Sequence, residues 1–176
     1  MRGRLYPWPL LALALAAACA APPDPRAPLM AALEKAGFTR MAADQAPGPV
    51  LSKAAGQGLS VSILLPPPPK SPGPGQVREV VAVIKVQGPG GDAQGPAQDQ
   101  VFRYNPDLHQ ALALASGGVY PPAAAAEILA QALDSAQGRG QSGALITSPK
   151  QGYALAVLIK DGRLAQVAVL RYPRPS

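Results

Sequence analysis

The chain has 176 residues, a formal net charge of +6 at pH 7, one cysteine and one histidine. One cysteine excludes an internal disulfide, and one histidine excludes a zinc site built from several histidines. The cations are spread along the sequence without interleaved aromatic residues, so the composition predicts no nucleic-acid partner.

The first 21 residues have the layout of an export signal. Arg2 and Arg4 form a basic start, Leu10–Ala18 is an unbroken apolar stretch, and small residues surround Cys19. The apolar stretch is too short to span a bilayer. This layout resembles a bacterial lipoprotein signal peptide, although Ala16 stands where that class usually has leucine, three residues before the cysteine.

The resemblance implies a membrane-anchored protein of the cell envelope whose mature chain begins at Cys19, lipidated with fatty-acyl groups such as palmitate. Two alternatives remain: cleavage by ordinary signal peptidase to give a periplasmic or secreted protein starting at Ala21, and retention of an uncleaved anchor. A lone cysteine is a liability in an oxidising compartment unless lipidation consumes it, which favours Cys19 as the lipidation site. The predicted organisation is a signal peptide at residues 1–18, a Pro-rich tether at 19–28 and one α+β domain at 29–176.

The domain begins with a predicted short helix. Pro28 suits a first helical position, Leu29–Ala36 has apolar residues at helical spacing, and Gly37 with Phe38 suits a helix end. A strand is predicted at Leu59–Leu65, where apolar residues alternate with serines.

A second strand is predicted at Val77–Val86, with Val80, Ala82, Ile84 and Val86 on one side. Gln100–Tyr104 reads as a third strand, followed by a type I turn at Asn105-Pro106-Asp107. The segment Gln110–Ala115 fits either a strand returning from that turn or a helix capped by Asp107, and the turn favours the strand.

The best predicted helix is Pro121–Gln137, which begins with proline and ends before Gly138. Three strands are predicted after it, and Asp161-Gly162 indicates a tight hairpin between the last two. A two-residue turn would place Ile159 opposite Leu164 and Val157 opposite Gln166. The strands are predicted at Ala144–Thr147, Tyr153–Lys160 and Arg163–Tyr172.

The fold class predicted from these elements is α+β, with an antiparallel sheet of about six or seven strands and two helices packed on one face. The second face of the last hairpin, including Ala156, Leu158 and Val167, is nearly free of polar groups. We therefore expect that face to meet loops, another subunit, an apolar ligand or a protein partner. Segments starting at Gln57-Gly58 and Gln151-Gly152 are similar, through either a repeated helix-and-strands unit or chance.

No motif predicts catalytic, cofactor-binding or metal-binding residues. Gly88–Ala93 formally matches a dinucleotide-binding fingerprint, but Gly95-Pro96 follows in place of a helical pattern, so a plain loop is expected. His109, two residues after Asp107, is interpreted as a residue beside a turn whose replacement leaves folding intact.

The ten acidic residues are dispersed along the sequence. The predicted function is therefore non-catalytic binding or scaffolding by a lipid-anchored envelope protein. The alternatives are a periplasmic hydrolase that uses two of the dispersed carboxylates, and a carrier or chaperone with a cavity for an apolar ligand between sheet and helices.

Overall fold

The computed structural model describes residues 24–42, 46–68, 79–92, 95–137 and 142–172. The predicted signal peptide, Cys19 and the tether as far as Pro23 lie outside these residues. In the part of the chain that the structure describes, no helix is both long and apolar enough to cross a membrane.

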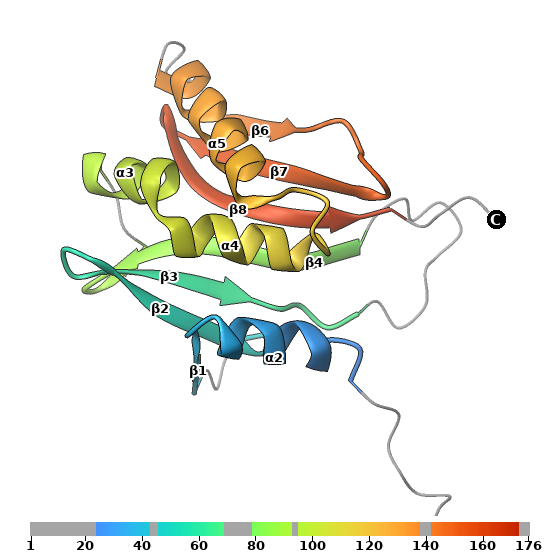
Figure 1. Cartoon of the computed structure of the whole chain (residues 1–176). Helices are drawn as coiled ribbons and strands as arrows, with labels where there is room; N and C mark the ends of the chain where they lie inside the picture. Colours follow the sequence, from blue (N-terminus) through green and yellow to red (C-terminus); the bar gives the residue numbers. More distant parts are fainter. Residues whose placement is uncertain (1–23, 43–45, 69–78, 93–94, 138–141, 173–176) are drawn as a thin grey trace, which may run out of the picture.

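The described residues form four helices and one antiparallel sheet of eight strands (Figure 1). The sheet order is β1-β2-β3-β4-β8-β7-β6, and β5 pairs with β4. The predicted α+β class is confirmed, with more strands and helices than expected. The strands are β1 (Thr39–Met41), β2 (Val50–Gly56), β3 (Leu59–Leu64), β4 (Glu79–Gly88), β5 (Gly91–Asp92), β6 (Gly143–Ile146), β7 (Tyr153–Lys160) and β8 (Arg163–Arg171). The helices are α2 (Ala27–Lys35), α3 (Pro96–Tyr104), α4 (Pro106–Ala115) and α5 (Pro122–Gln137).

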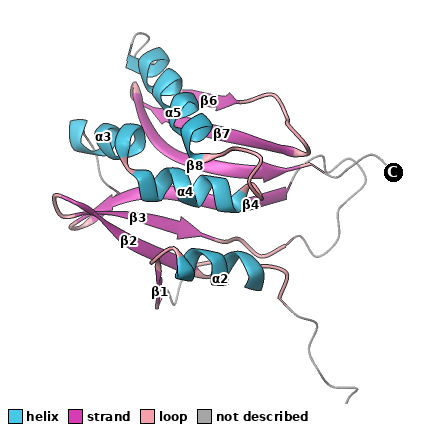
Figure 2. Ribbon diagram, in the orientation of Figure 1, coloured by secondary structure: helices cyan, strands magenta, loops and turns pink. Residues whose placement is uncertain are grey.

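The helices lie together on one side of the sheet (Figure 2). There α3, α4 and α5 contact strands β4, β7 and β8, while α2 packs beside α4. A row of paired side chains crosses five neighbouring strands beneath them, and each is fully buried: Leu51, Ile63, Ile84, Val167 and Val157. This row is the floor of the hydrophobic core.

The opposite side of the sheet, here called the open face, carries none of the described helices (Figure 2). Cross-strand pairing gives it an apolar row over seven strands: Met41, Val50, Leu64, Val83, Ala168, Ala156 and Ile146. Met41 and Ile146, at the two ends of the row, are 52% and 43% exposed. The expectation that the second face of the last hairpin is apolar therefore holds at Ala156.

Two bulges correct the predicted registers. One lies between Val80 and Ala82, which turns Val80 to the open face, and the other lies between Leu158 and Ile159 in the last hairpin. Ile159 still pairs with Leu164, but Val157 pairs with Val167 in place of the expected Gln166. The expected position of Val167 on the second face is therefore wrong, because the extra residue in β8 directs Val167 into the core.

The region from Pro96 to Ala115 is helical, so the predicted strands at Gln100–Tyr104 and Gln110–Ala115 are wrong. The predicted turn is a helix start: the Asn105 side chain accepts a 2.9 Å hydrogen bond from the Leu108 amide, and Pro106 occupies the first turn. Asparagine before proline suits both a turn and a helix N-cap, and burial of α4 against α2 and α5 favours the helix.

The remaining local signals are confirmed. Helix α2 ends as expected, with Gly37 at φ +90° and the Phe38 amide bonded to the Leu33 carbonyl. Asp161 and Gly162 both have positive φ, as a two-residue hairpin requires.

The similar segments at Gln57 and Gln151 occupy equivalent places. Each begins at a turn in which both residues have positive φ, and each leads into the middle strand of a three-strand meander. The meanders β2-β3-β4 and β6-β7-β8 meet at the β4–β8 pair, so the sheet order is nearly symmetric about its centre. The chain therefore uses a helix followed by a meander twice.

Candidate functional site

A cavity of about 320 Å³ lies between the helices and one end of the sheet. It is bounded by the start of α2, the end of α4, the prolines after β3, the start of β4 and β7, and the end of β8. Pro25 and Arg26, among the first residues that the structure describes, line it, so we call it the tether-end cavity. A carrier for an apolar ligand, one of the alternatives predicted from the sequence, would need a space between sheet and helices.

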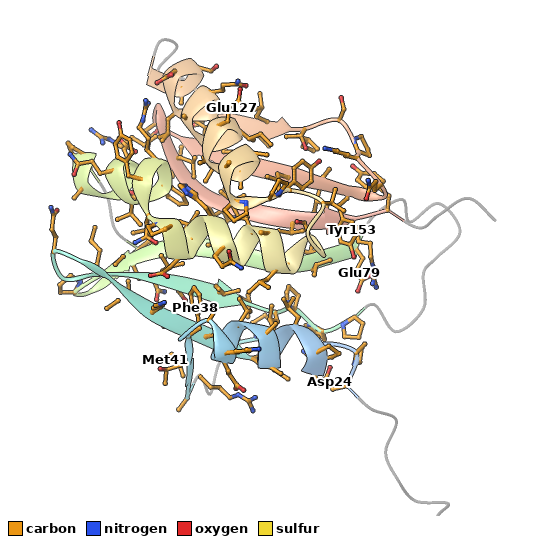
Figure 3. The ribbon with its side chains drawn as sticks, viewed as in Figure 1. Asp24, Phe38, Met41, Glu79, Glu127 and Tyr153 are labelled. Carbon is orange, nitrogen blue, oxygen red and sulfur yellow. The ribbon has the colours of Figure 1, made fainter. Side chains whose placement is uncertain are left out.

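Three side chains from neighbouring strands form the polar wall of the cavity. Sheet register pairs Glu79 of β4 with Arg171 of β8, and Arg171 with Tyr153 of β7. The Arg171 Nε donates to Glu79 Oε2 at 2.9 Å. Figure 3 shows Glu79 and Tyr153 at the same end of the sheet. Gly117, at the end of α4, lies beside the Tyr153 hydroxyl, and a Cβ added there would stand at an ordinary contact distance of 3.7 Å. Glycine suits this position because its φ is +62°.

A second guanidinium enters from the start of α2. Arg26 Nε donates to Asp24 Oδ1 at 2.9 Å, and Arg26 Nη1 donates to the Leu65 carbonyl at 3.4 Å. The hydrogen bond with Arg26 is the main reason that the pKa of Asp24 is lowered. The hydrogen bond with Glu79 raises the pKa of Arg171. Arginine is charged at any physiological pH, so each guanidinium at the edge of the cavity is a cation held by a carboxylate.

The other walls of the cavity are apolar. Leu29 and Ala32 of α2 face Leu114 and Ala115 of α4, and Val81 lies at the bulge of β4. Four prolines complete the lining: Pro25, Pro28, Pro66 and Pro68. Proline has no backbone N–H, so these walls offer few hydrogen-bond donors. The lining is thus divided into an apolar part and a charged part.

Most acidic residues within the described ranges form isolated ion pairs. Seven carboxylates each pair with a different lysine or arginine: Asp24, Glu34, Glu79, Asp92, Asp99, Asp107 and Asp134. Of the acidic residues that the structure describes, Glu79 is the one that lines the tether-end cavity. Among the described side chains, no group of three from His, Cys, Asp and Glu stands close enough to hold a metal ion.

His109 and Asp107 do not form the polar turn that the sequence indicated. His109 is buried in α4, and its Nε2 lies 2.9 Å from the Phe102 carbonyl oxygen, with the ring nitrogen as donor. Asp107 accepts a 2.8 Å hydrogen bond from Lys53 Nζ, which also donates to the Ala36 carbonyl at the end of α2. Both residues hold helices in place and lie outside the tether-end cavity.

The described part of the fingerprint segment, Gly88–Asp92, is the tight link between β4 and β5. The expectation that no helix follows it is wrong, since α3 begins at Pro96 directly after Gly95. Cys19, the predicted lipidation site, lies outside the described residues. The sequence reasoning missed the cavity, since its walls come from six separate stretches. The clustering of prolines at 22–28 and 66–69 was its only visible signal.

A second cavity of about 380 Å³ lies near the far end of the β7–β8 hairpin. Two carboxylates, Asp92 and Asp161, line it together with Lys160. Asp92 pairs with Lys85 at 3.2 Å, and Asp161 accepts a 3.5 Å hydrogen bond from the Ser142 hydroxyl.

No family model, curated protein or solved structure matches this chain. The function is therefore argued from the geometry of the cavities and from the N-terminal segment.

Proposed function

We propose that this protein is an exported, lipid-anchored protein of the cell envelope with a non-catalytic binding role, and that the tether-end cavity holds its ligand. The observation that carries the proposal is the position of that cavity. Its rim includes Pro25 and Arg26, so it lies where the tether from Cys19 joins the domain.

The size and lining of the cavity support binding. Pockets that hold small molecules span roughly 300–1,000 Å³ and combine apolar walls with a few polar groups. The tether-end cavity, at about 320 Å³, has both. The Glu79 carboxylate is engaged by Arg171, which leaves it poorly placed to act as a general base. The arrangement therefore favours holding a molecule over transforming it.

The test of anchoring is the mass of the mature N-terminus together with membrane fractionation. We expect Cys19 to carry acyl chains and the full chain to sediment with membranes, whereas a Cys19→Ser variant is released. A mature protein that starts at Ala21, or a Cys19→Ser variant that stays in the membrane, would contradict lipid anchoring.

A hydrolase remains the second candidate because Asp92 and Asp161 line one cavity. Two carboxylates that line one space can serve as acid and base in glycoside hydrolysis, and here Asp161 is the freer of the two, since Asp92 is held by Lys85. Screening the wild type and the Asp161→Asn variant against glycoside substrates tests this candidate. Turnover by the wild type that Asp161→Asn abolishes would replace the binding role with an enzymatic one.

A further inference from the structure

The tether-end cavity divides its lining in a way that indicates the class of its ligand. Apolar side chains of α2 and α4 form one part, and the charged groups Arg26, Glu79 and Arg171 stand at the edge. Each guanidinium is paired with one carboxylate, Arg26 with Asp24 and Arg171 with Glu79, so the edge offers guanidinium N–H donors without a net charge. A ligand that matches this lining has an apolar body and a single anionic head.

Arg171 is placed to meet such a head. Its Nε and Nη2 both reach Glu79 Oε2, and half of the side chain is exposed. A guanidinium has five N–H donors, so the ion pair with Glu79 leaves donors for a second carboxylate or a phosphate. Tyr153, next to Arg171 in the sheet register, adds an amphipathic ring to the same wall.

A lipid anchor on Cys19 would place the cavity close to a membrane, which is a source of amphiphilic molecules. Five peptide units separate Cys19 from Asp24, and an extended chain spans at most about 3.6 Å per residue, or roughly 18 Å in all. If Cys19 is acylated, the rim of the cavity at Pro25 therefore lies near the membrane surface. A single-chain lipid would have only a short distance to travel from the bilayer into the cavity.

We infer that the tether-end cavity binds one molecule of a single-chain anionic amphiphile, such as a long-chain fatty acid, with its chain between α2 and α4 and its head at Arg171. The cavity lies near the lower end of the volume range for ligand pockets, which suits one chain and excludes a two-chain lipid held whole. The inference rests on the proposed binding role, and it names the ligand class.

The test uses the full chain with Cys19→Ser, so that binding is measured in water, without a bilayer that competes for the probe. The probes are hexadecanoate, hexadecan-1-ol, acetate and inorganic phosphate, each added as a competitor of a fluorescent fatty acid. We expect saturable binding of one hexadecanoate per chain, at least tenfold weaker binding of the alcohol, and no displacement by acetate or phosphate. Displacement by acetate or phosphate at similar concentrations would overturn the inference in favour of a simple anion site.

Two pairs of variants separate the chain site from the head site. Ala32→Trp fills the cavity from α2, and its control is Ala31→Trp on the exposed side of the same helix. Arg171→Gln removes the head contact, and its control is Arg163→Gln, at the other end of β8 and also ion-paired with a carboxylate. We expect Ala32→Trp to abolish binding of both long-chain probes and Arg171→Gln to weaken only hexadecanoate, about tenfold, with both controls within twofold of the parent chain. If Ala32→Trp binds normally, or Arg171→Gln weakens both probes equally, the assignment fails.

The anchoring experiment and the binding experiment can fail independently of each other. Hexadecanoate binding by a chain whose Cys19 proves not to be acylated would remove the anchor and keep the cavity assignment. Acylation of Cys19 without hexadecanoate binding would keep the anchor and overturn the inference.

Discussion

The two faces of the sheet receive similar residues and give them different surroundings. On the helix-covered side, Ile84 and Val167 are fully buried, whereas on the open face Val80 and Leu158 are 38% and 39% exposed. Residue type does not separate these pairs, since all four are large aliphatic side chains. What separates the two pairs is the register of the strands. In β4 and in β8 a single extra residue determines which side chains point into the core.

The open face also changes character along the strands. Toward the tether end, Val80 of β4 lies beside Leu170 and Ala154, both of which are buried although they point away from the described helices. Toward the other end, Lys85 lies beside Gln166 and Ser62. The helix-covered face shows no such gradient in its central row. We therefore expect a substitution on the helix-covered face to lower the unfolding free energy much more than a similar substitution on the open face.

The largest effect is expected for Val167→Asp compared with Ala156→Asp. Val167 is fully buried under the helices, so a carboxylate there would lose its hydration without gaining a partner and would cost at least about 4 kcal/mol of unfolding free energy. Ala156 points to the open face, and its substitution should cost about 1 kcal/mol or less. Urea unfolding measures both. Equal losses would show that the open face is as dry as the core.

A smaller contrast is expected for two leucines of β7. Leu155→Ala removes a fully buried side chain and should cost about 2–5 kcal/mol, whereas Leu158→Ala removes a partly exposed one and should cost under about 1 kcal/mol. The two substitutions are matched, since both replace leucine with alanine in the same strand. Thermal unfolding checks the order, and a reversed order would contradict the register of the hairpin.

His109→Ala should lower the unfolding free energy by about 1–3 kcal/mol, because it removes a buried hydrogen bond and leaves the Phe102 carbonyl without that partner. This replaces the expectation from the sequence, in which His109 lay beside a turn. The neighbouring Gln110→Ala, at an exposed position of α4, is the matched control and should change little. A His109→Ala protein as stable as the wild type would show that water satisfies the carbonyl.

The smallest effect concerns Asp99, in the first turn of α3, which is ion-paired with Arg163 of β8. Burial raises the pKa of Asp99 above its usual value near 3.8, although Arg163 and Arg103 oppose the shift, and its Oδ1 is buried without a hydrogen-bond partner. A carboxyl whose pKa is higher in the folded state loses stabilisation as the pH rises from its unfolded pKa through its folded pKa.

Asp99→Asn should therefore remove a loss of stability that sets in as the pH rises just above 4, so that the variant gains stability relative to the wild type over that range, with a change at neutral pH of no more than about 1 kcal/mol. Urea unfolding between pH 3 and pH 7 measures both quantities. If the variant has the same pH dependence as the wild type, Asp99 does not contribute to that dependence and other carboxylates account for it.

The sequence predicted the elements whose ends carry strong local signals. Proline and glycine mark the limits of α2 and α5, and Asp161-Gly162 marks the last hairpin. The prediction failed where one signal fits two structures, as at Asn105-Pro106, which suits a turn and a helix cap equally. It also missed β2, because Lys53 points toward the helices there and interrupts the alternation.

The tether-end cavity was beyond local reasoning for a different reason. Glu79 and Arg171 are 92 residues apart, and no periodicity in either strand indicates that they meet. Their pairing follows from the sheet order, which places β4 beside β8. From the sequence, a space between sheet and helices was named only as a requirement of the carrier alternative, with no position and no charge.

The central place of β8 has a consequence for how the molecule assembles. The last strand in the chain fills the middle of the sheet, between β4 and β7. The first half, α2 to β4, therefore exposes the bonding edge of β4 until the C-terminal strand arrives. Closure across so many residues is slow, because the entropy of a long loop is lost before the strands pair. A chain truncated before Arg163 would leave two bare edges, at β4 and β7, and such edges recruit strands from other molecules.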